Sequence, residues 1–559
     1  MKFSNIQYNR PDIKTLIDSV NSCRQDFEKA KDADDQVKIY LEMTKALESP
    51  MTMTNLAFIR YYQNTTDEFY NNEKQYLDQA MPKLQNALTE FSKSMLSSPF
   101  KNELKTKLPP IIMLNKEIQA KAMSPKIIDQ KIAENKLINQ YTNLMSLVVV
   151  DFDGQKLTPS ELGKYMSHSN REIRRAATIA YGLELNKIKD QLDNIFDQMV
   201  KIRHNMAIKM GYKDYVELGY CQMTRNCYGQ DDIQKFREAV LEYVVPAVCK
   251  LKQKVSKDLS IDKMKLYDDE VYLKGGKPCP IISSDQIMRQ GSLMYNELNN
   301  EIGALYDRMI NCETFDVLSR RGKWGGGFCE GLDEFRLPFI LSNFNGTSDD
   351  IDVLTHEMGH AFAFWKSWEL DIPEARNATF EICEVHSMSM EFFTHKFMEK
   401  FFGEGANDYR YAHLASMLAF LPYGTIVDYF QHLVYQNPYL SPRERNDIWL
   451  KLERQYRPYM DAQGLPFFEE GRAWQIKAHI YESPFYYIDY CLAQTVALQF
   501  YALIQKDYNL AWQTYYDFVS KAGLLTFAQL IEQSNLRSPF EQSTLENISQ
   551  TALAALGID

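Results

Sequence analysis

Apolar residues recur at steps of three and four positions over long stretches of the chain, which is the spacing of one face of an α-helix. The pattern runs through residues 12–47, 75–96 and 171–210. Glycine and proline, which interrupt helices, number only 24 and 20 among 559 residues. The sequence therefore predicts a mainly helical fold.

Three segments depart from this pattern. Residues 147–154 read as a short strand followed by a turn, and residues 267–282 as a β-hairpin or an irregular loop. Residues 321–350 are irregular, with three consecutive glycines and then the strand-like run FRLPFILSNF. A small β element is therefore expected just before the segment that begins at residue 351.

The chain is longer than the size at which a single hydrophobic core stops growing, so we expect two lobes. We place an N-terminal helical lobe at residues 1–190 and a catalytic lobe at residues 191–559. The sequence leaves the oligomeric state open.

Composition narrows the class of protein. The net charge of -11 argues against nucleic acid as a partner, because a phosphate backbone favours a basic surface. The nine cysteines are scattered without C-x-x-C spacing, which favours a reducing cytoplasm over a disulfide framework. The N-terminus lacks the apolar core of a signal peptide, and no apolar run is long enough to span a membrane.

The segment LTHEMGHAFAF carries an HExxH pattern. His356 and His360 lie one helical turn apart and can offer ring nitrogens to one metal ion, while Glu357 can reach a water molecule without being a ligand. A chain of this composition should show the pattern by chance only about 0.02 times. Residues 347–350 resemble a capping box at the start of this helix.

A catalytic zinc site typically uses three protein ligands and one open position. Residues 374–402 read as a second helix, on which Glu384 is the favoured third ligand and Glu381 the alternative. His386 should face another side of this helix, Cys383 should be a small buried residue, and Glu391 reads as a solvated surface charge. Zinc is the expected metal, although manganese or cobalt would also suit these ligands.

A hydrolase of this kind must also stabilise a developing oxyanion. His479, Tyr486 and Tyr490 share one helical face by spacing, with Tyr487 and Tyr481 close to it. A phenol or an imidazolium from this group could donate a hydrogen bond to the oxyanion. The alternative is that these tyrosines only form a hydrophobic core.

Gly325, Gly326 and Gly327 form a glycine loop ahead of the strand-like run. Such a loop could pair with the backbone of a substrate, or it could be a plain surface turn. The segment has neither a Walker pattern nor a G-x-G-x-x-G pattern, so a phosphate site is not expected.

Three segments together, FNGTSDDIDVLTHEMGHAF, FEICEVHSMSMEFF and HIYESPFYYIDYCLAQ, resemble the oligoendopeptidase F and Pz-peptidase branch of the thimet oligopeptidase family of zinc metallopeptidases. The resemblance implies a two-lobed helical clamshell with a deep central channel and zinc at its floor. It implies cytoplasmic enzymes that cut short oligopeptides. Carried over by motif, it gives His356, His360 and Glu384 as zinc ligands, Glu357 as general base, His479, Tyr486 and Tyr490 at the transition state, and Tyr487 and the glycine loop at the substrate.

The sequence thus predicts an endopeptidase that hydrolyses internal bonds of short oligopeptides with a metal-activated water and Glu357 as general base. An HExxH exopeptidase and a non-catalytic helical peptide-binding protein are the alternatives. No G-x-M-E-N-like element for anchoring an amino terminus is present, which disfavours the first, and the base beside the histidines disfavours the second.

Overall fold

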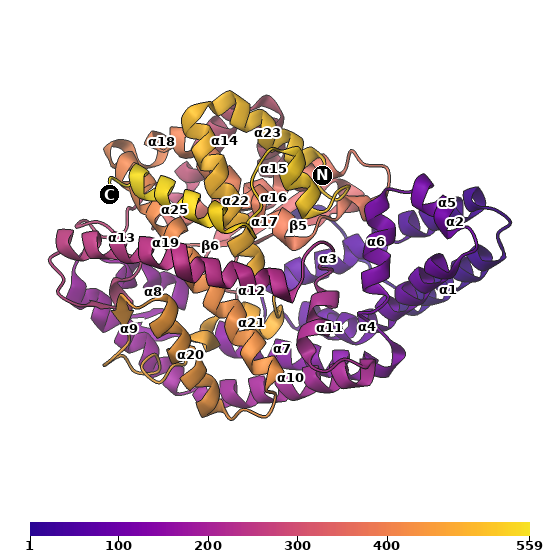
Figure 1. Cartoon of the computed structure of the whole chain (residues 1–559), viewed down its shortest axis with the longest axis horizontal. Coiled ribbons are helices and arrows are strands. Elements are labelled where there is room, and N and C mark those ends of the chain that lie inside the picture. Colours follow the sequence, from indigo (N-terminus) through magenta and orange to yellow (C-terminus); the bar gives the residue numbers. More distant parts are fainter. Residues whose placement is uncertain (559) are drawn as a thin grey trace.

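Helices dominate the computed structural model of the chain, which describes residues 1–558 (Figure 1). The N-terminal helices project as an arm from a larger body, and their buried residues form a core of their own. Their bounds are α1 (Ile13–Lys29), α2 (Ala33–Ala46), α3 (Glu48–Gln63), α4 (Glu68–Ser97), α5 (Lys101–Lys107) and α6 (Pro110–Gln119). The helical pattern of residues 12–47 is divided at Asp32, whose side chain accepts a hydrogen bond from the Asp35 amide and begins α2.

The middle of the chain adds a further set of helices to the larger body. The pattern of residues 171–210 is likewise divided, because the chain turns near Ile188 between two helices. The helices here are α7 (Ile128–Ser146), α8 (Pro159–Met166), α9 (Arg171–Asn186), α10 (Lys189–Met210), α11 (Tyr215–Gln222), α12 (Gln230–Ala239), α13 (Val245–Asp258), α14 (Ser284–Leu298) and α15 (Asn300–Asn311).

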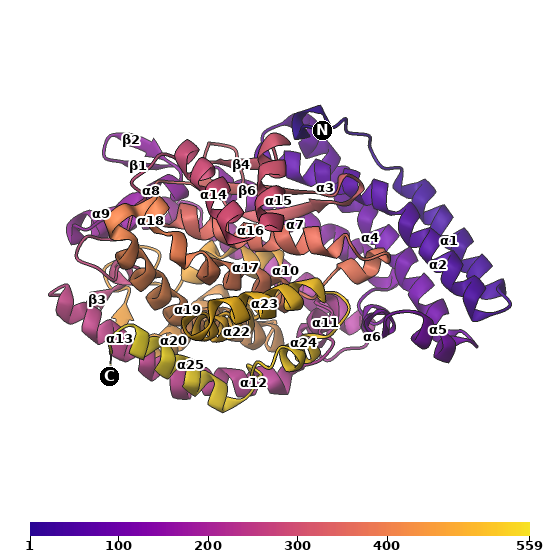
Figure 2. The ribbon, with the colours of Figure 1, turned by 90° about the horizontal axis from the view of Figure 1, so that it is seen from above.

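The last third of the chain supplies the centre of the body. Figure 2 shows α16 and α17 there, with the sheet strands on one side and α19 and α22 on the other. These helices are α16 (Asp349–Ser367), α17 (Phe380–Phe393), α18 (Glu399–Phe402), α19 (Ala406–Gln436), α20 (Pro442–Tyr456), α21 (Ala478–Glu482), α22 (Tyr487–Lys506), α23 (Tyr508–Ser520), α24 (Phe527–Gln533) and α25 (Gln542–Ala555).

The strands are few and short. The predicted strand and turn form an antiparallel hairpin of β1 (Val150–Phe152) and β2 (Gln155–Leu157). A three-stranded sheet packs beside α16 in the order β4-β6-β5, with β4 (Phe315–Leu318) parallel and β5 (Phe328–Leu332) antiparallel to the buried β6 (Leu337–Phe344). Residues 267–282 are irregular rather than a hairpin, and the nearby β3 (Met264–Lys265) pairs instead with the distant β7 (Met460–Asp461).

The N-terminal arm is fastened to the short segment between α16 and α17. Glu374 in this segment accepts hydrogen bonds from the Tyr40 hydroxyl and from the Lys116 ammonium, the latter at 2.5 Å. Arg376 pairs with Glu48 of α3 at 3.1 Å. Helices separated by more than 250 positions in the sequence therefore meet next to the helices that carry the HExxH motif and Glu384.

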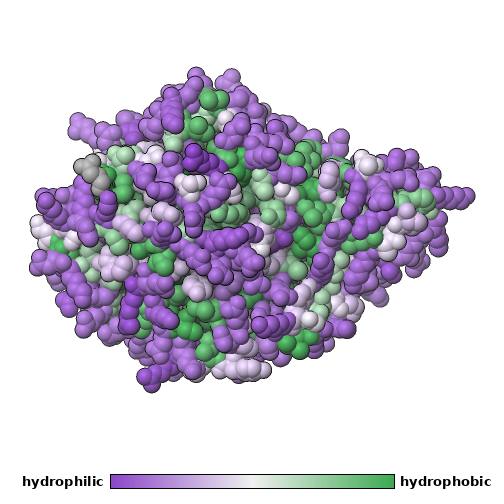
Figure 3. Space-filling model, viewed as in Figure 1, coloured by the Kyte–Doolittle hydropathy of each residue, from purple (hydrophilic) through white to green (hydrophobic). Residues whose placement is uncertain are grey.

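The predicted fold class, mainly α and two-lobed with a small β element next to the active-site helix, is confirmed. The lobe boundary near residue 190 stays a prediction. Among residues 1–558, no helix is long and apolar enough to cross a bilayer. The face of the molecule in Figure 3 is covered mainly by hydrophilic side chains.

Candidate metal centre and active site

Two helices carry the candidate ligands, and a glycine lets them cross closely. A Cβ atom at Gly359 of α16 would lie 2.5 Å from the His386 carbonyl oxygen and 2.6 Å from the Ser387 Cα atom of α17. No side chain fits between these backbones. The glycine inside the HExxH motif therefore sets how near α17 can bring Glu384 to the histidines.

The start of α16 differs from the prediction. The expected capping box over residues 347–350 is wrong, because Ser348 occupies the N-cap without a side-chain hydrogen bond. Asp350 instead turns back and accepts hydrogen bonds from the Asn345 amide at 2.8 Å and the Gly346 amide at 3.0 Å. The carboxylate thus holds the turn between β6 and α16 that aims the helix.

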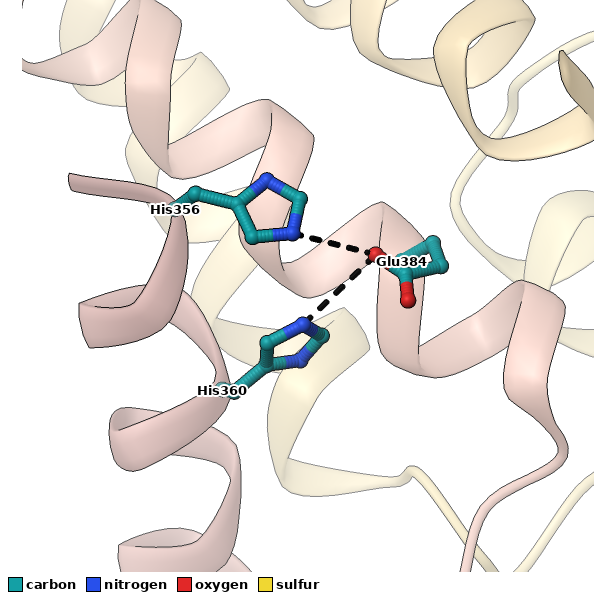
Figure 4. A group of neighbouring side chains, drawn as sticks. All are labelled: His356, His360 and Glu384. Carbon is teal, nitrogen blue, oxygen red and sulfur yellow. Dashed lines mark ion pairs between the residues drawn. The ribbon is translucent and has the colours of Figure 1, made fainter. Parts of the chain in front are cut away.

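His356, His360 and Glu384 converge on one point (Figure 4). The Nε2 atoms of His356 and His360 lie 3.2 and 3.5 Å from the same Glu384 oxygen, Oε2. Burial raises the pKa of Glu384, but the two histidines outweigh burial and hold that pKa well below its usual range. Glu384 is 1% exposed, whereas the histidines are 19% and 15% exposed, so the cluster is open on the histidine side.

The donor set fits a zinc ion. Two imidazole nitrogens and one carboxylate oxygen are ligands that zinc prefers, and neighbouring ligands around a tetrahedral zinc should lie about 3.3 Å apart. The observed separations of 3.2 and 3.5 Å agree with that value, and all three ligand atoms lie within 4.8 Å of one another. Glu381, the alternative ligand, is buried elsewhere: it accepts a hydrogen bond from Thr379 at 2.6 Å and is not part of the cluster.

Glu391 was missed by sequence reasoning, and its interpretation as a solvated charge is wrong. It is buried, and its two oxygens accept from His356 Nδ1 at 2.7 Å and from His413 Nε2 at 2.8 Å. His413 in turn contacts His395 at 3.0 Å. The bond to Nδ1 fixes the ring of His356 and leaves Nε2 as its metal-binding nitrogen. A signal existed, since Glu391 follows Glu384 by two helical turns on the same face of α17.

The other residues of α17 lie apart from the cluster. His386 is fully enclosed, neither of its ring nitrogens has a hydrogen-bond partner, and burial lowers its pKa to about 3. It packs against Phe518, on a different side from Glu384, as the sequence indicated. Cys383 is partly buried, and burial raises the pKa of its thiol.

Glu357 lies beside the candidate ligands in a dry environment. Burial raises the pKa of its carboxyl, and one oxygen, Oε2, has no hydrogen-bond partner. The other oxygen faces the glycine loop, where a Cβ atom at Gly327 would lie 3.4 Å from it. A carboxylate with a free oxygen and a raised pKa is suited to accepting a proton.

The residues predicted near the transition state come together despite a break in the helix. His479 lies on the short α21, Tyr486 precedes α22, and Tyr490 lies within α22. The Tyr490 hydroxyl is 3.2 Å from His479 Nε2, whereas the Tyr486 hydroxyl donates to Glu384 Oε1. Burial lowers the pKa of His479 to about 3, with a smaller contribution from Lys477, so the ring is a neutral imidazole and not an imidazolium.

The loop that places Tyr486 is held by buried side chains. Phe485 has a left-handed backbone with φ of 68°, which is strained for a bulky residue. Its N–H donates to Gln431 at 3.0 Å, and its carbonyl accepts from Arg225 at 2.6 Å. Arg225 also pairs with Asp489. Both polar backbone atoms of the strained residue are therefore fixed from outside the loop.

The glycine loop is also anchored. The Asn343 side chain on β6 donates to the carbonyls of Trp324 at 2.9 Å and Gly326 at 2.8 Å. None of Gly325, Gly326 and Gly327 adopts a left-handed φ. A Cβ atom at Gly326 would collide with the Trp324 ring, while the space beside Gly325 is open. The structure thus brings Gly327 to Glu357 and leaves a substrate role for the loop as a prediction.

Comparisons with known proteins agree with this geometry. The peptidase M3 N-terminal domain matches residues 3–123, and peptidase family M3 matches residues 298–550. The solved structure of Pz-peptidase A with an inhibitor is 37% identical, covers 100% of this chain and 99% of that one, and superimposes with a TM-score of 0.97.

Two curated relatives are more distant. Oligopeptidase PepF of Bacillus subtilis (strain 168) is 21% identical over 89% of this chain and 76% of its own length. An oligoendopeptidase F homolog of Mycoplasma genitalium is 23% identical over 40% of this chain and 37% of its own length. The resemblance inferred from the motifs is confirmed, and the chain belongs to peptidase family M3 as a metallo-oligopeptidase.

Proposed function

We propose that this protein is a zinc-dependent endopeptidase that hydrolyses internal bonds of short oligopeptides. The observation that carries the proposal is the convergence of His356, His360 and Glu384 next to a buried Glu357 with one free oxygen. His356, His360 and Glu384 would hold the metal. A zinc ion bound there would supply a Lewis acid that polarises the scissile carbonyl and lowers the pKa of a water molecule to about 7.

Glu357 acts as the general base. Its carboxylate accepts a proton from the attacking water and later delivers it to the leaving amine, which is the usual double role of such a group. Its burial supports this role, because a carboxylate whose pKa is raised is a stronger base and accepts a proton more readily than one with an ordinary pKa.

Tyr490 and His479 stabilise the oxyanion. In the tautomer that carries its proton on Nε2, the neutral imidazole would donate to the Tyr490 oxygen and leave the phenol proton free for the substrate. Tyr486 holds Glu384, and Tyr487 and the glycine loop bind the peptide. The cysteines are scattered along the chain without C-x-x-C spacing, which supports a reducing cytoplasm as the location.

The test uses internally quenched peptides that are blocked at both ends. We expect cleavage at internal bonds, loss of cleavage after treatment with a chelator, and recovery when zinc is restored. Cleavage only of peptides with a free end would replace the endopeptidase with an exopeptidase. Zinc binding without any cleavage would indicate a non-catalytic peptide-binding protein.

A further inference from the structure

Lys477, near the candidate site, lacks the carboxylate partner that the buried arginines and lysines of the described residues have. Within residues 1–558, each buried arginine and lysine has a carboxylate within ion-pair distance, as Arg203, Lys252 and Lys323 illustrate. Lys477 is half-buried, and no carboxylate of the described residues lies within that distance of its ammonium group. A charge taken partly out of water without a counter-ion is costly unless something else supplies one.

Two tyrosines surround the ammonium group of Lys477, and their hydroxyl oxygens can accept from it while their O–H groups stay free to donate. Its Nζ atom lies 5.3 Å from the centre of the Tyr423 ring and 5.1 Å from that of the Tyr487 ring. Arg457 lies on the same Tyr423 ring at 5.1 Å, but Asp269 already neutralises it. An ammonium group and two phenols offer several N–H and O–H donors, and no anionic acceptor is present to receive them.

This cluster borders the reacting groups. The Tyr487 ring lies 5.1 Å from the His479 ring as well as 5.1 Å from the Lys477 ammonium, so it neighbours both. Lys477 also contributes to the electrostatic environment of His479. A peptide bound at His479 and Tyr490 would pass within reach of the donors.

We propose that Lys477, with the Tyr423 and Tyr487 hydroxyls, forms a subsite for a carboxylate of the bound peptide. The inference rests on the proposed function, because it assigns the subsite to the same peptide-cleaving site. The carboxylate comes either from the C-terminus of the peptide or from an Asp or Glu side chain at a fixed distance from the scissile bond. Hydrogen bonds to charged groups contribute enough to favour such a peptide roughly ten- to a hundredfold.

The experiment compares matched peptides that differ in one carboxylate. Quenched peptides with a common core and one to six residues after the cut are made as C-terminal acids and amides. A second series of amides carries Glu or Gln at each of these positions. We expect kcat/KM for the favoured acid to exceed that for its amide about ten- to a hundredfold, and the two series to identify which carboxylate is bound.

Lys477→Met, which keeps the apolar stem on the two rings, should bring this ratio to within about twofold. Any effect of the lost charge on His479 would change the rates for acids and amides equally and cancel in the ratio. Lys477→Arg should retain most of the preference. Lys396→Met is the matched control, because Lys396 also lies on a tyrosine ring, that of Tyr508, but is exposed and far along the chain from His479. A ratio near one in the wild type, or a ratio unchanged in Lys477→Met, would overturn the proposal.

Binding separates this proposal from the proposed function. The same peptides, labelled for fluorescence anisotropy, are titrated against Glu357→Gln with and without Lys477→Met. A carboxylate preference in binding that depends on Lys477, without cleavage by the wild type, would reject the endopeptidase and keep the subsite. Cleavage without any carboxylate preference would reject the subsite alone. An equal loss of binding for acids and amides in Lys477→Met would make Lys477 structural and also overturn it.

Discussion

Three carboxylates meet at the candidate metal centre, and their hydrogen bonds distinguish their roles. Glu384 is bonded through both oxygens, to Tyr486 and Ser387, in addition to facing the histidines. Glu391 is bonded through both oxygens to histidines. Among these three, only Glu357 keeps an oxygen without a hydrogen-bond partner in the described part of the chain. The free oxygen is what a base needs, because a bonded one must first give up its donor.

Glu357→Gln should therefore keep the metal and lose turnover by about 10²- to 10⁴-fold, the usual contribution of a general base. The measurements are kcat with a quenched peptide and zinc content after gel filtration. Glu404→Gln, at an exposed position, serves as the control. A variant that kept most of its kcat would show that another group accepts the proton.

The two tyrosines should separate in their effects. Tyr490→Phe should lower kcat about 10²- to 10³-fold with little change in KM, because its phenol acts on the oxyanion. Tyr486→Phe should instead weaken zinc binding, because its hydroxyl is bonded to Glu384. Zinc affinity is read from competition with a chromophoric chelator. If Tyr490→Phe kept the wild-type kcat and Tyr486→Phe kept the wild-type zinc affinity, the tyrosines would have only a packing role.

Glu391→Gln should weaken zinc binding about 10- to 100-fold, because the His356 ring loses its anionic partner. Glu381→Gln is a matched control, since Glu381 is also buried on α17 but does not touch a candidate ligand. The same chelator competition measures both variants. Equal losses of zinc affinity in the two variants would mean that zinc binding depends on any buried charge of α17 and not on the contact with His356.

At the scale of elements, the crossing of α16 and α17 decides whether the residues form a site. Periodicity predicted both helices, and the ligand spacing on α16 follows from one helical turn. The position of Glu384 relative to the histidines depends on contact between backbones at Gly359, which no pattern along the chain encodes. Glu391 was misread for the same reason, because its hydrogen-bond partners lie on two other helices, His356 on α16 and His413 on α19.

The β strands also include one that local sequence predicts and a pairing that it does not. The strand before α16 was predicted, because its apolar run is local, whereas the pairing of β3 with β7 joins residues almost 200 positions apart. The short α21 and the strained Phe485 were also beyond prediction, since Arg225 in the loop between α11 and α12 and Gln431 in α19 hold that segment. Local sequence specifies the elements, and distant side chains specify how the catalytic loop runs between them.

Gly359→Ala should force the two helices apart. We expect a loss of stability of about 1–3 kcal/mol, as for other overpacked contacts, and at least tenfold weaker zinc binding. Thermal unfolding and chelator competition provide the two readouts. Gly275→Ala, where the added methyl group meets open space and the backbone φ is not left-handed, is the control. A loss of stability with unchanged zinc affinity would show that the distance between the two helices at Gly359 does not control the geometry of the metal ligands.

For the molecule as a whole, a buried ion pair joins helices that are distant in sequence. Arg203 of α10 contacts Glu134 of α7 at 2.6 Å and the Tyr435 hydroxyl of α19 at 2.6 Å. It also donates to the carbonyls of Ile480 and Tyr481 on α21, next to His479. The guanidinium thus ties the catalytic loop to the body of the protein.

This pair should make stability depend on acid pH. Burial raises the pKa of Glu134, but Lys131 and Arg203 outweigh burial and lower it to about 2. Because the folded-state pKa is below the unfolded one of about 4.3, the stabilisation is complete above pH 4.3 and is lost as pH falls towards 2. Its size is about 3 kcal/mol.

Urea unfolding between pH 6 and pH 3 measures this dependence. Glu134→Gln should be less stable than the wild type at pH 6 and should lose less stability on acidification. Glu172→Gln, at an exposed ion pair, should follow the wild-type curve, because such pairs contribute less than about 1 kcal/mol. Parallel curves for Glu134→Gln and the wild type would assign the acid sensitivity to other carboxylates.

The contacts of Glu374 and Arg376 have a consequence for how the chain can be divided. Residues 298–550 contain almost every candidate site residue discussed above, and they could be mistaken for a self-sufficient enzyme. Yet the bridge between the two ligand-bearing helices has its partners, Tyr40, Lys116 and Glu48, in the N-terminal arm. Removing the arm would leave Glu374 and Arg376 without these partners, so we expect residues 298–550 alone to hold the two ligand-bearing helices less firmly than the full chain does.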